Sequence, residues 1–133
     1  MGIRVVCAGT FDHLHPGHID FLRQAKAFGS ELVVIVARDR NVLKIKGIKP
    51  DHNEQTRLRN VEGTGIADRV VLGNLEGDLF SILLELSPDV VALGYDQRAK
   101  DEHIRDKLPE CSIVRLRPFH PEKFKSSFYR KKK

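Results

Sequence analysis

The sequence predicts a single α/β domain built on a parallel β-sheet with helices on both faces. Short, continuous apolar runs, typical of strands that are buried on both sides, alternate along the chain with segments whose apolar residues recur at helical spacing. Strands and helices that alternate in this way form parallel sheets with right-handed crossover connections. The length of 133 residues and the 41% of hydrophobic residues fit one domain with an ordinary core.

The individual elements follow from these patterns in chain order. The first strand is an apolar run interrupted only by Arg4, and the second is the apolar run that follows Glu31. The helices are placed by the helical spacing of their apolar residues, and Ser87-Pro88 ends the helix before it. The predicted strands are therefore 3–8, 31–37, 69–72, 89–93 and 112–116, and the predicted helices are 19–28, 54–63, 78–86 and 100–108.

The segments between these elements are predicted to be irregular. Gly29 is predicted to stop the first helix, whose apolar face would run from Ile19 to Phe28. The polar and basic segment 41–53, which contains Lys44, Lys46, Gly47, Lys49 and Pro50, predicts a mobile loop. Residues 117–133 predict a loop followed by a tail that is basic from about residue 125.

The stretch from Ala8 to His18, AGTFDHLHPGH, is the most distinctive part of the chain. It connects the first predicted strand, through a turn with Gly9, to the first predicted helix. A helix N-terminus offers unpaired N–H groups and a partial positive charge, so this arrangement suits phosphate binding. Pro16-Gly17 fits a first helical turn that a ligand approaches closely. We expect His15 and His18 to point at one ligand, although a single histidine near a helix start is more often a surface or capping residue.

The other turns of interest follow the remaining strands. Ligands of parallel α/β sheets bind beyond the C-terminal ends of the strands. The turn at Gly9, the segment after Val36, the turn at Gly94 and the segment after Leu116 all come directly after predicted strands. We therefore expect these four segments to converge on one edge of the sheet.

Composition and charge exclude several classes of protein. No apolar run approaches the roughly 20 residues that cross a membrane, and no signal peptide precedes the motif, so we expect a cytoplasmic protein without a membrane partner. The net charge is +5, but the last four residues are all basic, and the rest carries 19 basic and 18 acidic side chains. A nucleic-acid partner is therefore not expected. Cys7 and Cys111 lack metal-binding spacing and predict reduced thiols.

The string GTFDxxHxGH after a first strand resembles the HxGH nucleotidylyltransferase superfamily, and in particular its cytidylyltransferase-like branch. The resemblance implies a Rossmann-like domain over residues 1–133, with five parallel strands in the order 3-2-1-4-5. It also implies an enzyme in which a phosphate attacks the α-phosphorus of a nucleoside triphosphate and pyrophosphate leaves. Such enzymes position the reactants and stabilise charge. We expect a homodimer.

The resemblance also implies which residues act. His15, His18 and Lys46 would be catalytic, and the backbone at Thr10 and Phe11 would contact the α-phosphate. Asp12 would either cap the helix or lie near a divalent metal ion, for which the sequence does not identify the ligands. The expected nucleotide-binding residues are Gly9, Thr10, Phe11, Asp12, His15, His18, Lys44, Arg57, Gly94, Tyr95, Asp96, Arg117, Lys125, Ser126 and Ser127.

The chain departs from the family pattern at two places. The helix after the lysine-containing segment normally opens with an acidic residue followed closely by arginine. Glu54 and Arg57 match this pattern with a different spacing, so Glu54 is left outside the expected site. The threonine that normally follows the C-terminal arginine is missing after Arg117.

The substrate is indicated by the fourth-strand turn. Gly94-Tyr95-Asp96-Gln97, together with GTFDHLHPGHIDFL and the Lys-Ser-Ser near the terminus, resembles archaeal-type FAD synthases, which transfer AMP from ATP to FMN. Asp96 can accept a hydrogen bond from a ribose hydroxyl or an adenine amine, and Tyr95 can either stack on a ring or pack under the sheet edge. Candidates for an apolar flavin platform are Phe119, Phe124, Phe128 and Tyr129.

Two other functions fit parts of the sequence. A cytidylyltransferase that acts on glycerol 3-phosphate or a similar phospho-polyol would share the same phosphate machinery. A non-catalytic nucleotide- or RNA-binding module would use the basic tail. The intact His15, Gly17 and His18 favour an enzyme, and the aromatic residues near the tail lack an RNA-binding pattern.

Overall fold

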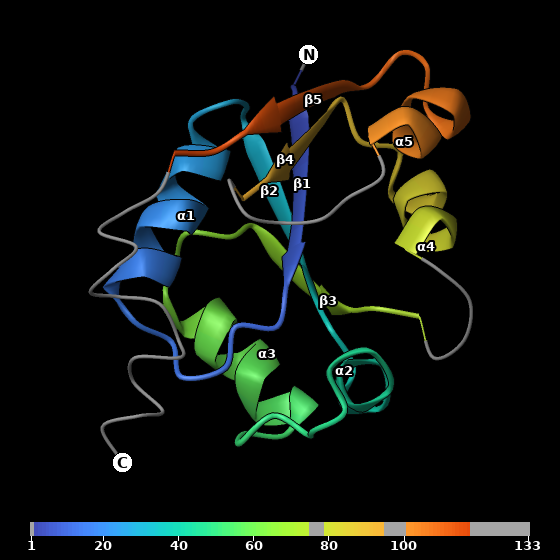
Figure 1. Ribbon diagram of the computed structural model, residues 1–133. Coiled ribbons are helices and arrows are strands. Elements are labelled where there is room, and N and C mark those ends of the chain that lie inside the picture. The colour runs from blue at the N-terminus through green and yellow to red at the C-terminus, as the bar shows by residue number, and fades with distance from the viewer. Residues whose placement is uncertain (1, 75–78, 95–100, 118–133) are drawn as a thin grey trace.

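The apolar runs of the sequence form one parallel sheet in the computed structural model, which describes residues 2–74, 79–94 and 101–117. The strand order is β3-β2-β1-β4-β5, and each pair of neighbours is parallel (Figure 1). The predicted fold class and strand order are therefore confirmed. The strands are β1 (Arg4–Gly9), β2 (Glu31–Val36), β3 (Arg69–Leu72), β4 (Val90–Leu93) and β5 (Ser112–Arg115), and the helices are α1 (Pro16–Lys26), α2 (Asp39–Lys46), α3 (Glu54–Gly63), α4 (Leu79–Leu86) and α5 (Asp101–Lys107).

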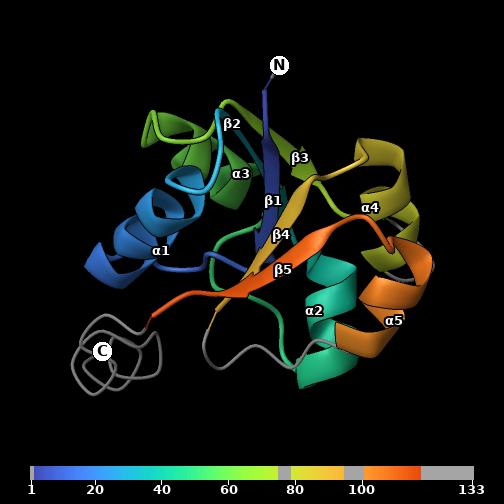
Figure 2. The same ribbon diagram turned by 90° about the horizontal axis from the view of Figure 1, so that it is seen from above.

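Helices cover both faces of the sheet, with α1 and α3 on one side and α4 and α5 on the other (Figure 2). Because successive side chains of a strand point to opposite faces, neighbouring residues of β1 belong to different cores. Val5 packs in one cluster with Leu22 of α1, and Val6 packs in the other with Leu83 of α4. The central strands are thus buried on both faces, which explains why they read as continuous apolar runs.

The carboxyl ends of the central strands meet at one edge, as predicted. Gly9 at the end of β1 lies opposite Val36 at the end of β2, and Cys7 lies opposite Ala92 of β4. The pairing continues one residue beyond β2, where the N–H of Ala37 donates to the carbonyl oxygen of Gly9 at 2.9 Å. The segments that follow β1, β2 and β4 therefore leave the sheet side by side.

The end of α1 differs from its prediction. The helix ends at Lys26, so Phe28 lies beyond it and is 47% exposed rather than part of the apolar face. Ala27 caps the helix in a right-handed conformation, and Gly29 supplies no left-handed stop. Glycine is required at position 29 because a Cβ atom there would lie 2.5 Å from the carbonyl oxygen of Ile3.

The prediction of an irregular loop over 41–53 is wrong for its first part, because residues Asp39–Lys46 form α2. This helix buries only Val42, while Leu43 and Ile45 are exposed, so its apolar residues do not form a buried face. Its stability has other sources. Asp39 lies in the first turn, Lys44 and Lys46 lie in the last, and these charges complement the helix dipole. Gly47 then ends the helix with a left-handed φ of 80°.

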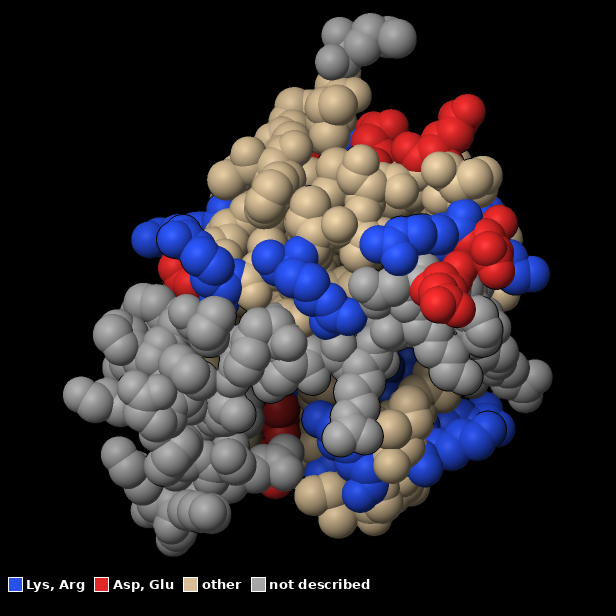
Figure 3. Space-filling view, turned by 45° about the horizontal axis from the view of Figure 1, so that its top comes forward, with Lys and Arg blue, Asp and Glu red and all other residues tan. Residues whose placement is uncertain are grey.

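The described surface carries charges of both signs. On the face seen in Figure 3, Lys and Arg side chains lie in several groups, with Asp and Glu beside some of them. This distribution agrees with the near balance of charge outside the last four residues. Within the described ranges, no helix combines the length and the apolar character needed to cross a membrane.

Both cysteines have free thiols, as predicted. Burial raises the pKa of the Cys7 thiol in β1 to about 12. The pKa of Cys111, which precedes β5, is raised as well, again chiefly by burial. Because the thiolate is the nucleophilic form, neither side chain is a good candidate for covalent catalysis.

Candidate active site

The turn between β1 and α1 has a strained backbone. Phe11 and His13 both adopt left-handed conformations, with φ of 55° and 52°. Residues with a Cβ atom rarely do so, and where they do they concentrate at functional sites. A Cβ atom at Gly9, just before this turn, would lie 2.9 Å from the ring of Phe11, so the ring would have to shift.

The two histidines of the motif cap α1. His15 is the N-cap residue, and its Nδ1 accepts a hydrogen bond from the N–H of Gly17 at 3.1 Å. In return, Nδ1 of His18 accepts from the N–H of His15 at 3.3 Å. Pro16 stands at the first helical position, where no N–H is needed. The other interpretation of these histidines, that they cap the helix, is therefore confirmed. Each cap uses the Nδ1 atom of the ring.

This capping defines the tautomer of both rings. A main-chain N–H can only donate, so each Nδ1 must present its lone pair. In a neutral imidazole the proton then resides on Nε2. Because Nδ1 accepts in both caps, His15 and His18 each present an Nε2–H donor at the N-terminus of α1.

Burial keeps these rings neutral. It is the main cause that lowers the pKa of His18 to about 3, with a further lowering by His15 and a partial opposing effect of Asp12. The pKa of His15 is also lowered, first by burial and then by His13. The two rings stack with centroids 3.9 Å apart, and Phe11 contacts His18 edge-on at 5.6 Å.

Asp12 does not cap α1, so that alternative for its role is wrong. Its side chain is 3% exposed and accepts from the N–H groups of Asp51 at 2.8 Å and His52 at 3.1 Å. These contacts join the motif turn to the segment before α3. His13 also reaches that segment, because its Nε2 contacts the Asp51 carboxylate. Asp12, His13 and Asp51 form a group that can hold a metal ion.

Arg57 is completely buried in α3 and connects three segments of the site edge. Its guanidinium donates to four acceptors. These are the carbonyl oxygens of His52 at 2.9 Å, Thr10 at 2.8 Å and Ala37 at 2.8 Å, and the Asp39 carboxylate at 2.5 Å. The structure therefore places Arg57 beneath the site as a support for its main chain.

Glu54, which the sequence analysis left outside the site, belongs to the same network. Its carboxylate accepts from the N–H of Asp39 at 2.9 Å and pairs with Arg38 at 3.2 Å. Asp39 accepts in turn from the N–H of Glu54 at 3.2 Å. These contacts tie the starts of α2 and α3 together. The sequence analysis missed this role of Glu54 because its spacing from Arg57 departs from the family pattern. The role also depends on α2, which the sequence did not predict.

The two lysines expected to bind the triphosphate are both exposed in the last turn of α2. Each helical residue is rotated by about 100°, so Lys44 and Lys46 leave the helix about 200° apart. A loop could have brought both side chains to one phosphate group. A helix directs them to opposite faces.

The other expected site residues lie near β4 and β5. The Arg115 guanidinium donates to the carbonyl oxygen of Gly94 at 3.0 Å. The main chain of Arg117 is held against α1 by Gln24, whose amide accepts from its N–H at 2.8 Å and donates to its carbonyl oxygen at 2.9 Å. Expected residues outside the described part of the chain are Tyr95, Asp96, Lys125, Ser126 and Ser127, together with Phe119, Phe124, Phe128 and Tyr129.

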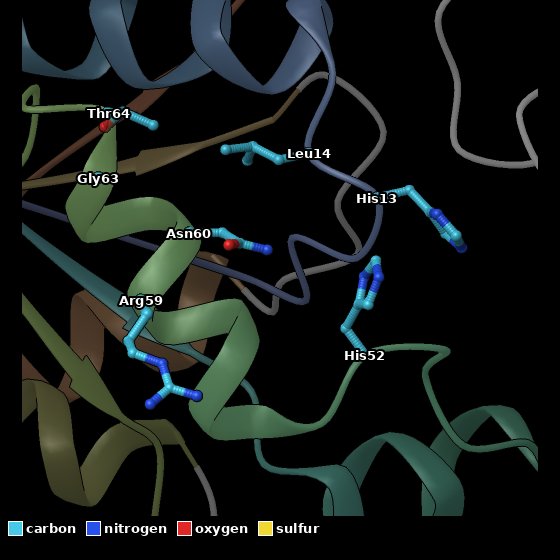
Figure 4. A pocket seen from close by; sticks show the side chains of 7 residues that line it. All are labelled: His13, Leu14, His52, Arg59, Asn60, Gly63 and Thr64. Atoms are coloured by element: carbon cyan, nitrogen blue, oxygen red, sulfur yellow. The ribbon is translucent and has the colours of Figure 1, made fainter.

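A pocket of about 670 Å³ lies between the motif turn and α3 (Figure 4). His13 and Leu14 contribute from the turn and His52 from the segment before α3. The α3 residues were not predicted, since polar residues on a helix surface carry no signal in a single sequence. The full lining is His13, Leu14, His52, Arg59, Asn60, Gly63 and Thr64.

A parallel sheet whose first strand runs through a strained turn into a histidine-capped helix is the framework of a nucleotide-binding α/β protein. The chain belongs to the cytidylyltransferase-like family, whose family model matches residues 6–132. Within it, the chain is similar to curated FAD synthases. It is 50% identical to that of Methanosarcina barkeri over 117 residues, which cover 85% of this chain and 82% of the relative. It is 38% identical to that of Thermoplasma volcanium over 134 residues, which cover 98% and 93%.

Solved structures show the same fold. A crystal structure from Thermoplasma volcanium GSS1, described as a lipopolysaccharide core biosynthesis protein, has a TM-score of 0.81 at 37% identity and covers 90% of this chain and 99% of its own. A protein of unknown function from Archaeoglobus fulgidus has a TM-score of 0.70 at 19% identity, with coverage of 86% and 90%. The second likeness concerns the fold alone.

Proposed function

We propose that this protein is an FMN adenylyltransferase. A phosphate oxygen of FMN attacks the α-phosphorus of ATP, the bond to the bridging oxygen of the β-phosphate breaks, and FAD and pyrophosphate form. The observation that carries the proposal is the similarity to FAD synthases over most of both chains. The histidine-capped helix at the sheet edge supplies donors that suit this chemistry.

His15 and His18 act as hydrogen-bond donors to the phosphates. Their Nε2–H groups are oriented by the caps before substrate arrives, so no reorganisation is needed as charge develops on the transferring group. The backbone at Thr10 and Phe11 holds the α-phosphate, and Arg57 positions this backbone through the carbonyl oxygen of Thr10. A divalent metal ion, when bound, neutralises charge on the phosphates.

The remaining contacts belong to this proposal as well. Gly94, Tyr95 and Asp96 hold the nucleoside at the end of β4, and Arg117 leads to the Lys-Ser-Ser segment that binds the outer phosphates. Lys46 contributes from α2, and Lys44, on the opposite side of that helix, is the alternative for this contact. A homodimer is the expected assembly.

The opposed directions of the two lysines lead to a prediction. Lys46→Ala should raise the KM for ATP about tenfold, as expected for loss of a charge-assisted contact of roughly 1.5 kcal/mol, and leave the KM for FMN unchanged. Steady-state rates with each substrate varied in turn measure both constants. Lys44→Ala is the matched comparison, because it removes the same charge from the opposite side of α2. A larger effect of Lys44→Ala would assign the contact to that residue instead.

The substrates are tested by a crossed assay. ATP or CTP is supplied with FMN or glycerol 3-phosphate and a divalent ion, and the products are separated by chromatography. We expect FAD from ATP and FMN, at least tenfold less product with CTP, and none with glycerol 3-phosphate, because each buried polar group left unpaired against the wrong base costs about 1–3 kcal/mol. A faster reaction of CTP with glycerol 3-phosphate would replace the proposal with the cytidylyltransferase alternative.

A further inference from the structure

We propose that the pocket between the motif turn and α3 holds the isoalloxazine ring of FMN, and that Asn60 and Gly63 select this ring. The inference rests on the proposed function, which names FMN as the acceptor but leaves the position of its ring open. It places the ring on described residues of α3 instead of on the aromatic residues that follow Arg117.

The first observation is the size and the position of the pocket. Its volume is about 670 Å³, and small-molecule sites commonly measure about 300–1,000 Å³. Leu14 lines the pocket and directly precedes His15, the N-cap residue of α1, which is assigned to the phosphates. A ligand whose ring occupies the pocket can therefore extend a phosphate group toward the N-terminus of α1.

The second observation is the topology of the sheet edge. In the order β3-β2-β1-β4-β5, the turn after β1 lies between the end of β4 on one side and β2 and β3 on the other. The proposed function assigns the nucleoside of ATP to the end of β4. The pocket lies on the side of α3, which leads into β3. FMN and ATP can therefore bind together, with their phosphates meeting at the turn between them.

The third observation is a glycine that the packing does not explain. Gly63 is the last residue of α3 and lines the pocket. Its φ is not left-handed, unlike that of Gly65, and a Cβ atom at position 63 would have no atom of the described residues within 4 Å. Nothing in the local structure requires glycine here, although glycine is among the least favourable residues in a helix. The bare backbone does leave room for the face of a flat ring.

The fourth observation is a polar group that is available to a ligand. In Figure 4, Leu14 points into the pocket from the motif turn, and Asn60 and Thr64 point into it from α3. The hydroxyl of Thr64 already donates to the carbonyl oxygen of Val61 at 2.7 Å. The side-chain amide of Asn60 is exposed and has no hydrogen-bond partner among the described residues. Asn60 is therefore the residue of this group that can pair with a ligand.

These features match the chemistry of the isoalloxazine ring. One edge of the ring alternates carbonyl oxygens with an N–H group, and the amide of Asn60 can donate to one and accept from the other. The faces of the ring are apolar, which suits Leu14 and the bare backbone of Gly63. A small phospho-polyol has no ring that could cover this apolar surface, so it would gain little from the pocket.

The test is a substitution that fills the pocket of the full chain. Gly63→Leu adds a side chain where the described structure leaves open space. We expect the KM for FMN to rise at least about tenfold and the KM for ATP to stay unchanged. Steady-state rates with each substrate varied in turn measure both constants. Urea denaturation should show that the variant is at least as stable as the unchanged protein, because leucine favours a helix more than glycine does.

A second variant tests the polar contact. Asn60→Ala removes the amide from an exposed position and enlarges the pocket, so it should not disturb the fold. We expect it to raise the KM for FMN about tenfold, again without changing the KM for ATP. Gln55→Leu is the matched control for Gly63→Leu, because it places the same side chain at an exposed position of α3 away from the described lining. It should leave both constants unchanged.

The outcomes separate this inference from the proposed function. If folded Gly63→Leu protein keeps the KM of the unchanged protein for FMN, the ring does not bind in the pocket, and the proposed reaction still stands. If the KM for ATP rises instead, the pocket belongs to the nucleotide and the inference is equally overturned. If the unchanged protein forms no FAD from ATP and FMN, the proposed function fails, and FMN is lost as the occupant with it.

Discussion

The His18→Asn variant is expected to turn over about a hundredfold more slowly or worse, and to remain folded. The amide oxygen of asparagine can replace Nδ1 of His18 as acceptor for the N–H of His15, so the cap survives. Asparagine has no atom at the position of Nε2, so one positioned donor to the phosphates is lost, which costs about two orders of magnitude in comparable sites. The measurement is kcat at saturating ATP and FMN, with the free energy of unfolding from urea denaturation.

The His18→Ala variant is the comparison, because it removes the donor and the cap together. It should lose the same activity and, in addition, about 1 kcal/mol of stability. Near-normal turnover in either variant would remove His18 from the catalytic machinery.

The His18→Asn substitution should also change how the free energy of unfolding depends on pH. The pKa of His18 falls from 6.5 to about 3 in the folded protein, so below pH 6.5 the unfolded chain binds a proton that the folded chain excludes. His18 therefore lowers stability progressively as the pH falls from about 6.5 to about 3. In His18→Asn this contribution is absent, and its unfolding free energy should fall less steeply with acidification.

Replacing Arg57 with methionine should destabilise the protein by about 3–5 kcal/mol, the range for removal of one partner from a buried charged network. The change removes the Arg57 donor from three carbonyl oxygens and from the Asp39 carboxylate, whose side chain is 30% exposed. Urea denaturation measures the loss directly. Arg57→Lys should recover only part of it, because one ammonium group cannot reproduce a fork of donors aimed at four acceptors.

Arg59→Met is the matched control for this prediction. It makes the same chemical change in the same helix, two residues further on, but at an exposed position. Its free energy of unfolding should change by less than about 0.5 kcal/mol. Equal stabilities of the Arg57→Met and Arg59→Met proteins would mean that the buried network contributes nothing net to folding.

The sheet was predictable from the sequence because its strands are buried on both faces. Runs such as that after Glu31 must be apolar at every position, and this leaves an unambiguous pattern. The strand order came from the likeness of the motif to a family, since spacing alone does not order strands.

The parts of the site that escaped prediction depend on polar contacts. Helix α2 is held by charge complementarity and one buried valine, which hydrophobic patterning does not register. Arg57 was expected at the site, but its supporting role was not, because a single sequence does not distinguish a buried arginine with four acceptors from a surface arginine. The joint position of Asp12, His13 and Asp51 arises from residues about 40 positions apart, and only the folded chain brings them together.

The reciprocal cap at α1 explains the spacing between the two histidines of the HxGH string. The first and fourth residues of the string must be the N-cap and third residues of one helix for both ring-to-backbone bonds to form. An insertion or deletion of one residue between them would rotate His18 by about 100° around the helix axis and break this reciprocity. The interval between the two histidines is thus dictated by the pitch of an α-helix rather than by the size of the ligand.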